Sequence, residues 1–227
     1  MPSLEILLLI FIAIAALLTA ISVHESAHAW MANRLGDPTA KHLGRISLNP
    51  ADHIDPIGTI FLPIVMLLIR GPLIGWAKPT PFNPWNLRNP KRDSALIALA
   101  GPASNFILAI LVALPIRFGL IPFLNPFNLS DPSLFFSASP IEKISLLLSG
   151  FLYLNLILGF FNLIPIHPLD GFKVVGGLLP KNLYYQWISL ERYGTLILLA
   201  LIFFGGSVIG LIIGPLLELT LRILVGG

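Results

Sequence analysis

The segment His24-Glu25-Ser26-Ala27-His28 has the residue types and the spacing of a metal-dependent hydrolytic site. Residues four apart lie on one face of a helix, about 6 Å from each other, so both imidazoles can reach a single metal ion. Zinc is bound by imidazoles, and a glutamate between two such histidines can take a proton from water. Ionisable residues inside an apolar helix are costly and usually functional. The segment therefore predicts a zinc site with Glu25 beside it.

A catalytic zinc ion uses three protein ligands and keeps one position open, so this motif lacks a ligand. The chain contains no cysteine, which leaves histidines and carboxylates as donors and excludes disulfides. Asp170 follows the fourth apolar stretch, where Pro165 and Pro168 break the helix and Gly171 permits a tight turn. An aspartate in such a place is a candidate for the third ligand.

The composition indicates that these residues belong to an integral membrane protein. Hydrophobic residues make up 56% of the 227 residues and charged residues only 11%, compared with about 25% in soluble domains. A net charge of +3 is typical of Lys and Arg in the cytoplasmic loops of membrane proteins, and no nucleic-acid partner is expected. The bilayer is therefore the expected environment.

The apolar residues form stretches that are each near the length of a membrane span. They cover residues 4–34, 57–76, 94–116, 143–166 and 193–217. We predict an all-α, polytopic helix bundle formed by one membrane-embedded domain, residues 1–227. Short extended or re-entrant segments are expected between the first and third main helices, because prolines interrupt 37–56 and 77–93.

Three of these stretches carry specific expectations about where helices end or break. The first is expected to be a retained helix, because Glu5 precedes its apolar core, and Gly36 is a plausible C-terminal cap. The second is interrupted by Arg70-Gly71-Pro72, and the last can kink at Gly205-Gly206 or Gly214-Pro215.

Three motifs in this order resemble the site-2 protease family of intramembrane zinc metalloproteases. They are His24 to His28, Gly101-Pro102-Ala103-Ser104-Asn105, and the segment from Asn162 to Leu169-Asp170-Gly171. Residues 49–59 (NPADHIDPIGT) and 75–84 (GWAKPTPFNP) are similar to the compact prokaryotic branch without PDZ or CBS domains.

The resemblance implies an endopeptidase that hydrolyses peptide bonds in or near transmembrane segments of membrane proteins. It assigns His24, His28 and Asp170 as zinc ligands and Glu25 as the general base. Asn105 and Asn162 match asparagines expected to hold the substrate backbone or the oxyanion. Hydrogen bonds between helices are an alternative role for both asparagines.

The remaining histidines have simpler interpretations. His42 is expected to be solvated, and His53, on a turn-rich segment, to contact a ligand rather than to bind the metal. His167 precedes Asp170 by three residues. It is expected to be a polar neighbour of the site, with direct coordination as the alternative.

Charge and geometry together predict the topology. If one zinc joins His24, His28 and Asp170, the first and fourth stretches end on the same side and the third runs the opposite way. Both ends of the stretch 57–76 must then lie on that side of the membrane, so this stretch is expected to be a re-entrant hairpin or an incomplete span. The same side carries ten basic residues: Arg34, Lys41, Arg45, Lys78, Arg88, Lys91, Arg92, Lys173, Lys181 and Arg192. Only Arg117 and Lys143 lie opposite, so we expect a multi-pass protein of the plasma or inner membrane with its active site nearer the cytoplasm.

Two other classes of function compete with proteolysis. A transporter or channel could use the His, Asp and Glu residues as a proton or cation path, but it would spread charges over several spans. A protease fold could also bind membrane proteins without cutting them, although the intact Glu25 favours cutting. The sequence indicates neither the physiological substrate nor the oligomeric state.

Overall fold

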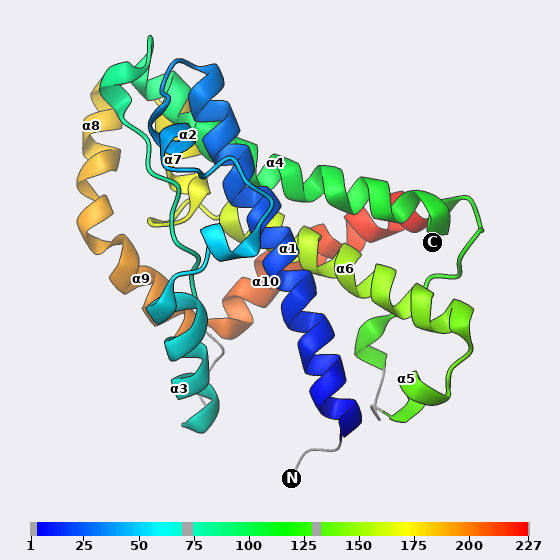
Figure 1. Cartoon of the computed structure of the whole chain (residues 1–227). Coiled ribbons are helices and arrows are strands. Elements are labelled where there is room, and N and C mark those ends of the chain that lie inside the picture. The colour runs from blue at the N-terminus through cyan, green and yellow to red at the C-terminus, as the bar shows by residue number, and fades with distance from the viewer. Residues whose placement is uncertain (1–3, 70–74, 129–132, 227) are drawn as a thin grey trace.

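The computed structural model describes residues 4–69, 75–128 and 133–226, and helices dominate this part of the chain (Figure 1). Four helices are long and apolar enough to cross a membrane: α1 (Leu4–Arg34), α4 (Pro90–Arg117), α6 (Pro140–Asn162), and α10 (Gly206–Leu221) with its continuation η5 (Arg222–Gly226). The described residues contain no β-strand. This confirms the predicted all-α, polytopic membrane class.

Shorter elements connect these helices. They are α2 (Thr39–His42), η1 (Pro50–Asp52), η2 (Pro56–Phe61), α3 (Leu62–Leu68), η3 (Pro84–Asn86), η4 (Pro126–Asn128), α5 (Ser133–Ser137), α7 (Asp170–Leu178), α8 (Lys181–Ser189) and α9 (Glu191–Phe204). Most of them lie between α1 and α4 or after α6, and prolines interrupt both of these parts of the chain.

Local sequence signals explain where the long helices begin and end. Gly36, two residues after α1 ends, has a φ of +111°, a left-handed conformation that favours glycine, as predicted for a cap. At the start of α6, the Ser139 hydroxyl accepts from the Glu142 amide while the Glu142 carboxylate accepts from the Ser139 amide. This capping box begins the helix three residues before the predicted apolar stretch.

Helices α1, α4 and α6 pack so that α4 runs opposite to its two neighbours, as the topology prediction requires. The start of α4 lies beside the end of α1, where the His28 ring contacts the Ile97 carbonyl. Farther along, Asn105 reaches both Ala20 of α1 and Asn155 of α6. The small buried residues Ala109 and Ala113 let α4 pack closely against α6.

The two ends of the stretch 57–76 lie side by side. The Trp76 amide donates to the Gly58 carbonyl at 3.1 Å, and the Thr59 hydroxyl donates to the Trp76 carbonyl at 2.8 Å. A Cβ at Gly58 would lie 2.3 Å from the Trp76 indole, so the two ends meet only because residue 58 is a glycine. The apolar helix between them, Pro56–Met66, is too short to cross a bilayer. This geometry agrees with the predicted re-entrant hairpin, whose expected interruption at Arg70-Gly71-Pro72 lies outside the described residues.

The C-terminal stretch 193–217 breaks at one of its two expected positions. It divides at Gly205, between α9 and α10. Pro215 lies inside α10, so the alternative break at Gly214-Pro215 does not occur. Helix α9 instead pairs with α8 at a bend of 57°. The fourth stretch also ends early, at Asn162 rather than 166, where the following residues turn toward α7.

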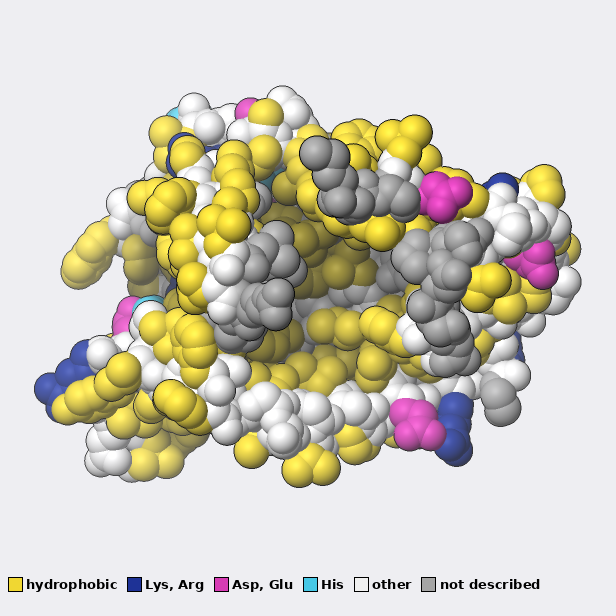
Figure 2. Space-filling view, turned by 90° about the horizontal axis from the view of Figure 1, so that it is seen from below, with side chains coloured by type: hydrophobic (Ala, Val, Ile, Leu, Met, Phe, Trp, Pro, Cys, Tyr) yellow, Lys and Arg dark blue, Asp and Glu magenta, His cyan; other side chains and the backbone are white. Residues whose placement is uncertain are grey.

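Large apolar side chains cover much of the molecular surface. Leu4 is 81% exposed and Phe11 68% exposed along the first half of α1, and Leu211 is 74% exposed on α10. Seen from below, hydrophobic side chains dominate and the few charged groups lie near the rim (Figure 2). Since water would oppose exposure on this scale, these faces contact lipid in a multi-pass membrane protein.

Candidate metal centre

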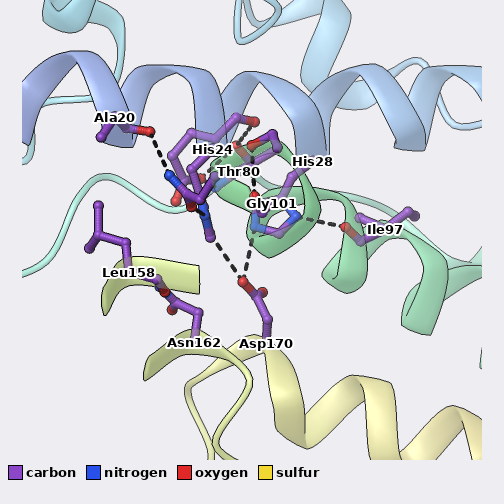
Figure 3. Close-up of polar contacts among 12 residues, drawn as sticks. Ala20, His24, His28, Thr80, Ile97, Gly101, Leu158, Asn162 and Asp170 are labelled. Carbon is purple, nitrogen blue, oxygen red and sulfur yellow. Dashed lines mark hydrogen bonds and ion pairs between the residues drawn. The ribbon is translucent and has the colours of Figure 1, made fainter. Parts of the chain in front are cut away.

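One face of α1 carries Ala20, His24 and His28 at intervals of four residues, and all three are buried against α4. The two imidazoles pack edge to face with their centroids 4.7 Å apart. Asp170, the first residue of α7, approaches from the other side (Figure 3). Its Oδ2 lies 3.1 Å from His24 Nε2 and 3.2 Å from His28 Nε2. The structure thus brings together the three predicted ligands, although His24 and Asp170 are 146 positions apart in sequence.

Hydrogen bonds at the far side of each ring orient the imidazoles. His28 Nδ1 lies 2.7 Å from the Ile97 carbonyl oxygen, which can only accept, so this nitrogen carries a proton. His24 Nδ1 lies 2.6 Å from Asn105 Oδ1. With the protons at Nδ1, both Nε2 atoms direct lone pairs at Asp170. Metal-binding histidines commonly have this arrangement.

The three facing atoms form a donor set that fits a cation. Two nitrogen lone pairs and a carboxylate oxygen repel one another unless a positive charge lies among them. Gly101 of α4 closes this space, since a Cβ there would lie 2.5 Å from His24 Nε2 and 2.4 Å from His28 Nε2. Two imidazoles and one carboxylate with an open position are a ligand set of catalytic zinc.

Two carboxylates compete for the third position in this donor set. The side-chain donor atoms of His24, Glu25 and His28 lie within 4.8 Å of one another. Asp170 nevertheless has the better geometry, because a single oxygen contacts both Nε2 atoms. The carboxylate of Glu25 is engaged elsewhere, which leaves it beside the donor set as the sequence analysis expects of a base.

Glu25 is held by Thr80, in the extended segment that returns from the 57–76 hairpin. Glu25 Oε2 accepts from the Thr80 amide at 3.0 Å and from the Thr80 hydroxyl at 2.8 Å. The same hydroxyl lies 3.1 Å from the Glu25 carbonyl. Only Oε2 takes part in these bonds, so the contact fixes the carboxylate and leaves Oε1 for another partner.

The segment with Thr80 is anchored by Asp37, just beyond the end of α1. Asp37 is fully buried and accepts from the Asn83 amide at 2.6 Å, the Asn86 side chain at 2.7 Å and the Thr39 hydroxyl at 2.5 Å. Burial alone would raise the pKa of this carboxyl, but the hydrogen bonds from Thr39, Asn86 and Asn83 outweigh it and lower the pKa below its ordinary value of 3.8.

The two predicted asparagines lie in different surroundings. Asn105 is fully buried behind His24, where it bonds the ring and Asn155, so its side chain faces the back of the ligand and not an open space. Asn162 is half-buried near Asp170 and donates to the Leu158 carbonyl of its own helix at 2.9 Å (Figure 3). Its Nδ2 is therefore engaged within α6.

The other histidines lie away from the donor set. His53 is buried, with Nε2 2.7 Å from the Ser47 carbonyl, so the expected contact to a ligand is not among its hydrogen bonds. His167 Nε2 pairs with Glu191 Oε1 at 3.2 Å and not with Asp170. His42 is exposed, as predicted.

Sequence reasoning missed Thr80, the part played by Gly101, and Asn155. Asn155 gave a signal as one of two amides within the apolar stretch 143–166, and Gly101 as the first residue of a quoted motif. Thr80 lies in a polar segment where nothing in the sequence distinguishes it.

Fold and site together define a polytopic membrane protein with a zinc-type donor set next to the carboxylate of Glu25. Comparison with known proteins agrees: residues 12–205 match the model of Peptidase family M50. The "Putative zinc metalloprotease YwhC" of Bacillus subtilis (strain 168) is 35% identical over 188 residues, 83% of this chain and 78% of that protein. The "Putative zinc metalloprotease Rip2" of Mycolicibacterium smegmatis is 27% identical over 189 residues, 83% of this chain and 65% of that protein.

The chain therefore belongs to peptidase family M50, the site-2 proteases, as the sequence resemblance indicated. It is a metalloprotease whose cofactor is zinc. A comparison with solved structures gives no significant match.

Proposed function

We propose that this protein is an intramembrane zinc endopeptidase that cuts other membrane proteins in or near their transmembrane segments. His24, His28 and Asp170 bind the zinc ion and Glu25 acts as the general base. The observation that carries the proposal is the convergence of both Nε2 atoms on one oxygen of Asp170, with the free edge of the Glu25 carboxylate beside them.

The residues around the donor set have separate roles in the proposed reaction. Zinc, when bound to this set, lowers the pKa of water and polarises the scissile carbonyl. Glu25 takes the proton from the attacking water at Oε1, because Thr80 occupies Oε2. Glu25 then delivers this proton to the leaving amine as the peptide bond breaks. Asn162, near Asp170, is the side chain that we assign to the substrate backbone or the oxyanion, through the second N–H of its amide, since the first is bonded to Leu158.

The substrate is a transmembrane segment in an unwound form. Peptide bonds within a helix are shielded by the helix itself, so the bond to be cut must leave it. Residues 75–83 form neither helix nor strand, and Thr80 within them contacts Glu25. An extended substrate can pair with such a backbone, while lipid surrounds the rest of the transmembrane helix.

Substitution at Glu25 tests the enzymatic part of the proposal. Glu25→Gln should keep the fold and the zinc but lose proteolysis of a membrane substrate, because an amide cannot accept the proton. Elemental analysis of the purified variant and a cleavage assay in detergent or liposomes measure the two properties. Asp170→Ala should lose both. Cleavage by Glu25→Gln at the wild-type rate, or full zinc content in Asp170→Ala, would contradict the proposal.

We further propose that the zinc site faces the cytoplasm in the plasma or inner membrane. The ends of α1 and α6 and the start of α4 meet at the donor set, and the ten basic residues of the sequence analysis lie at or beyond these ends. Because the chain has no cysteine, single cysteines report accessibility cleanly. Lys41→Cys and Arg88→Cys should resist an impermeant thiol reagent added to intact cells, whereas Leu120→Cys, beyond α4, should react. The reverse pattern would reject this orientation.

A further inference from the structure

Behind His24 a buried amide of α6, Asn155, contacts the amide of Asn105. Both side chains are fully buried at the centre of the α1, α4 and α6 packing. Asn105 Nδ2 lies 2.9 Å from Asn155 Oδ1, and Asn105 Oδ1 lies 2.6 Å from His24 Nδ1. Asn155 has no contact with the donor set itself in the described residues; its other bond is to the Phe151 carbonyl of its own helix, at 2.9 Å.

The chemistry of this chain allows only one orientation of each group. The Phe151 carbonyl can only accept, so Asn155 must place its NH2 there and its oxygen toward Asn105. That oxygen needs a donor, so Asn105 turns its NH2 toward α6 and its own oxygen toward His24. His24 must then donate from Nδ1, which leaves the lone pair on Nε2 where Asp170 faces it. The orientation of Asn155 thus favours that of Asn105, and the orientation of Asn105 favours the tautomer of His24.

We propose that Asn155 is a positioning residue that fixes the orientation of Asn105 and, through it, the tautomer of His24. This inference rests on the proposed role of His24 as a zinc ligand. Asn105 Nδ2 also donates to the Ala20 carbonyl, but this bond is long, at 3.4 Å, compared with 2.9 Å to Asn155. Without Asn155, only this weaker bond opposes rotation of the Asn105 amide among the described residues, so Asn105 can present NH2 to His24 Nδ1. That arrangement stabilises the other tautomer, in which Nε2 carries the proton and cannot bind a metal.

Removal of the polar group of Asn155 distinguishes this positioning role from ordinary packing between helices. An amide placed only to join α4 and α6 would affect stability and leave zinc affinity unchanged. A residue that orients a metal ligand from the second shell affects zinc affinity by about 10- to 100-fold. The two roles therefore predict different results for an apolar side chain of similar size.

The experiment compares Asn155→Leu with Asn155→Asp and with Ser145→Ala, all measured as zinc affinity by chelator competition on purified protein. Asn155→Leu removes both hydrogen-bonding groups and should weaken zinc binding about 10- to 100-fold. Asn155→Asp should bind nearly as wild type, since a carboxyl oxygen still accepts from Asn105. Ser145→Ala is the matched control, because Ser145 is also fully buried on α6 but bonds only the Ile141 carbonyl.

A second measurement keeps the inference testable if a variant folds poorly. Histidine labelled with nitrogen-15 reports the tautomer directly, and His24 should be protonated at Nδ1 in wild type and in Asn155→Asp but not uniformly in Asn155→Leu. In an Asn105→Ala background, Asn155→Leu should weaken zinc binding no further. Wild-type affinity or an unchanged His24 tautomer in Asn155→Leu overturns the inference. Failure of the proposed function would appear differently, as zinc binding that follows the predicted pattern without any proteolysis.

Discussion

The proposed general base, Glu25, lies between two proposed zinc ligands, His24 and His28, in the sequence, but it is held by a different kind of structure. His24 and His28 are fixed by α4, through a backbone carbonyl and a buried amide, within three long helices. Glu25, on the same turn of α1, is fixed by an extended segment that reaches it after a hairpin excursion. In the proposed site, the packed helices thus position the two histidine ligands, whereas the segment around Thr80 positions the proposed base.

This division predicts that metal binding and proton transfer can be impaired separately. The following substitutions address one region or the other, in order of decreasing expected effect. For Gly101→Ala and Asp37→Ala, a control makes the same kind of change at another position.

The largest effect is expected for Gly101→Ala. The new Cβ would lie 2.4 Å from His28 Nε2 and 2.5 Å from His24 Nε2, so both rings must move. We expect zinc affinity to fall more than about 100-fold and proteolysis to be lost, since ligand geometry is as critical as ligand identity. Alanine favours a helix over glycine by about 1 kcal/mol, so loss of zinc from a well-folded variant points to the site itself.

The control for Gly101→Ala is Gly210→Ala, in α10, where a Cβ meets nothing within 4 Å. It should retain zinc and activity. Wild-type zinc affinity in Gly101→Ala would show that the rings can be displaced without cost, and the helical region would not control the metal as proposed.

Thr80→Val should separate the base from the metal. The valine keeps the shape and the amide bond but removes the hydroxyl donated to Glu25 Oε2 at 2.8 Å. A hydrogen bond to a charged group is worth about 1.5–3 kcal/mol, which corresponds to a roughly 10- to 100-fold lower kcat if the carboxylate must be held for proton transfer. Zinc content should not change, and Thr80→Ser should restore kcat. A lower zinc content with normal kcat would contradict the division between the two regions.

Asp37→Ala tests how the extended segment is anchored. It deletes the acceptor of the bonds from Asn83, Asn86 and Thr39. We expect a loss of about 2–3 kcal/mol of stability, measured by thermal unfolding in detergent, and a several-fold lower kcat because Thr80 is no longer well placed. Zinc affinity should be nearly normal. Asp52→Ala, which removes another hydrogen-bonded carboxylate of the loops after α1, serves as the control for kcat.

The smallest effect concerns the stability of the protein at low pH. Because the folded state lowers the pKa of Asp37 below 3.8, the charged carboxylate stabilises the protein at pH values above about 4. This stabilisation is lost as the pH falls from about 4 through the lower pKa that Asp37 has in the folded state. Unfolding temperatures measured between about pH 6 and pH 3 should therefore fall less steeply in Asp37→Asn than in wild type. Parallel curves for the two proteins would show that Asp37 does not contribute to acid sensitivity.

The sequence predicted the donor set because each of its signals is local. Helical spacing places His24 and His28 on one face, and two prolines mark the turn that presents Asp170. The predicted direction of α4 followed from the requirement that a single metal ion joins His24, His28 and Asp170. The sequence offered two possible breaks in the last stretch, at Gly205 and at Gly214-Pro215. Local sequence does not encode which of them occurs, because the residues after Gly205 pack against the 163–169 turn.

The partners of these residues could not be predicted in the same way. Thr80 meets Glu25 across 55 positions, and Asn155 meets Asn105 across 50. Threonines and asparagines also occur at turns and surfaces for many other reasons, so their type alone indicates little. For the same reason Asn105 was expected to face the substrate, because the sequence does not show on which side of His24 it lies.

The distance of 146 positions between His24 and Asp170 has a consequence for biosynthesis. When α1 emerges from the ribosome and enters the bilayer, neither α4 nor Asp170 has yet been made. His24, Glu25 and His28 must then enter the membrane without their partners, at a cost that the apolar residues 6–18 can offset during insertion. The donor set is completed only after the chain has passed residue 170. A nascent chain released earlier has the two histidines and the glutamate but lacks Asp170, so the proposed zinc site is incomplete while the chain is still being inserted.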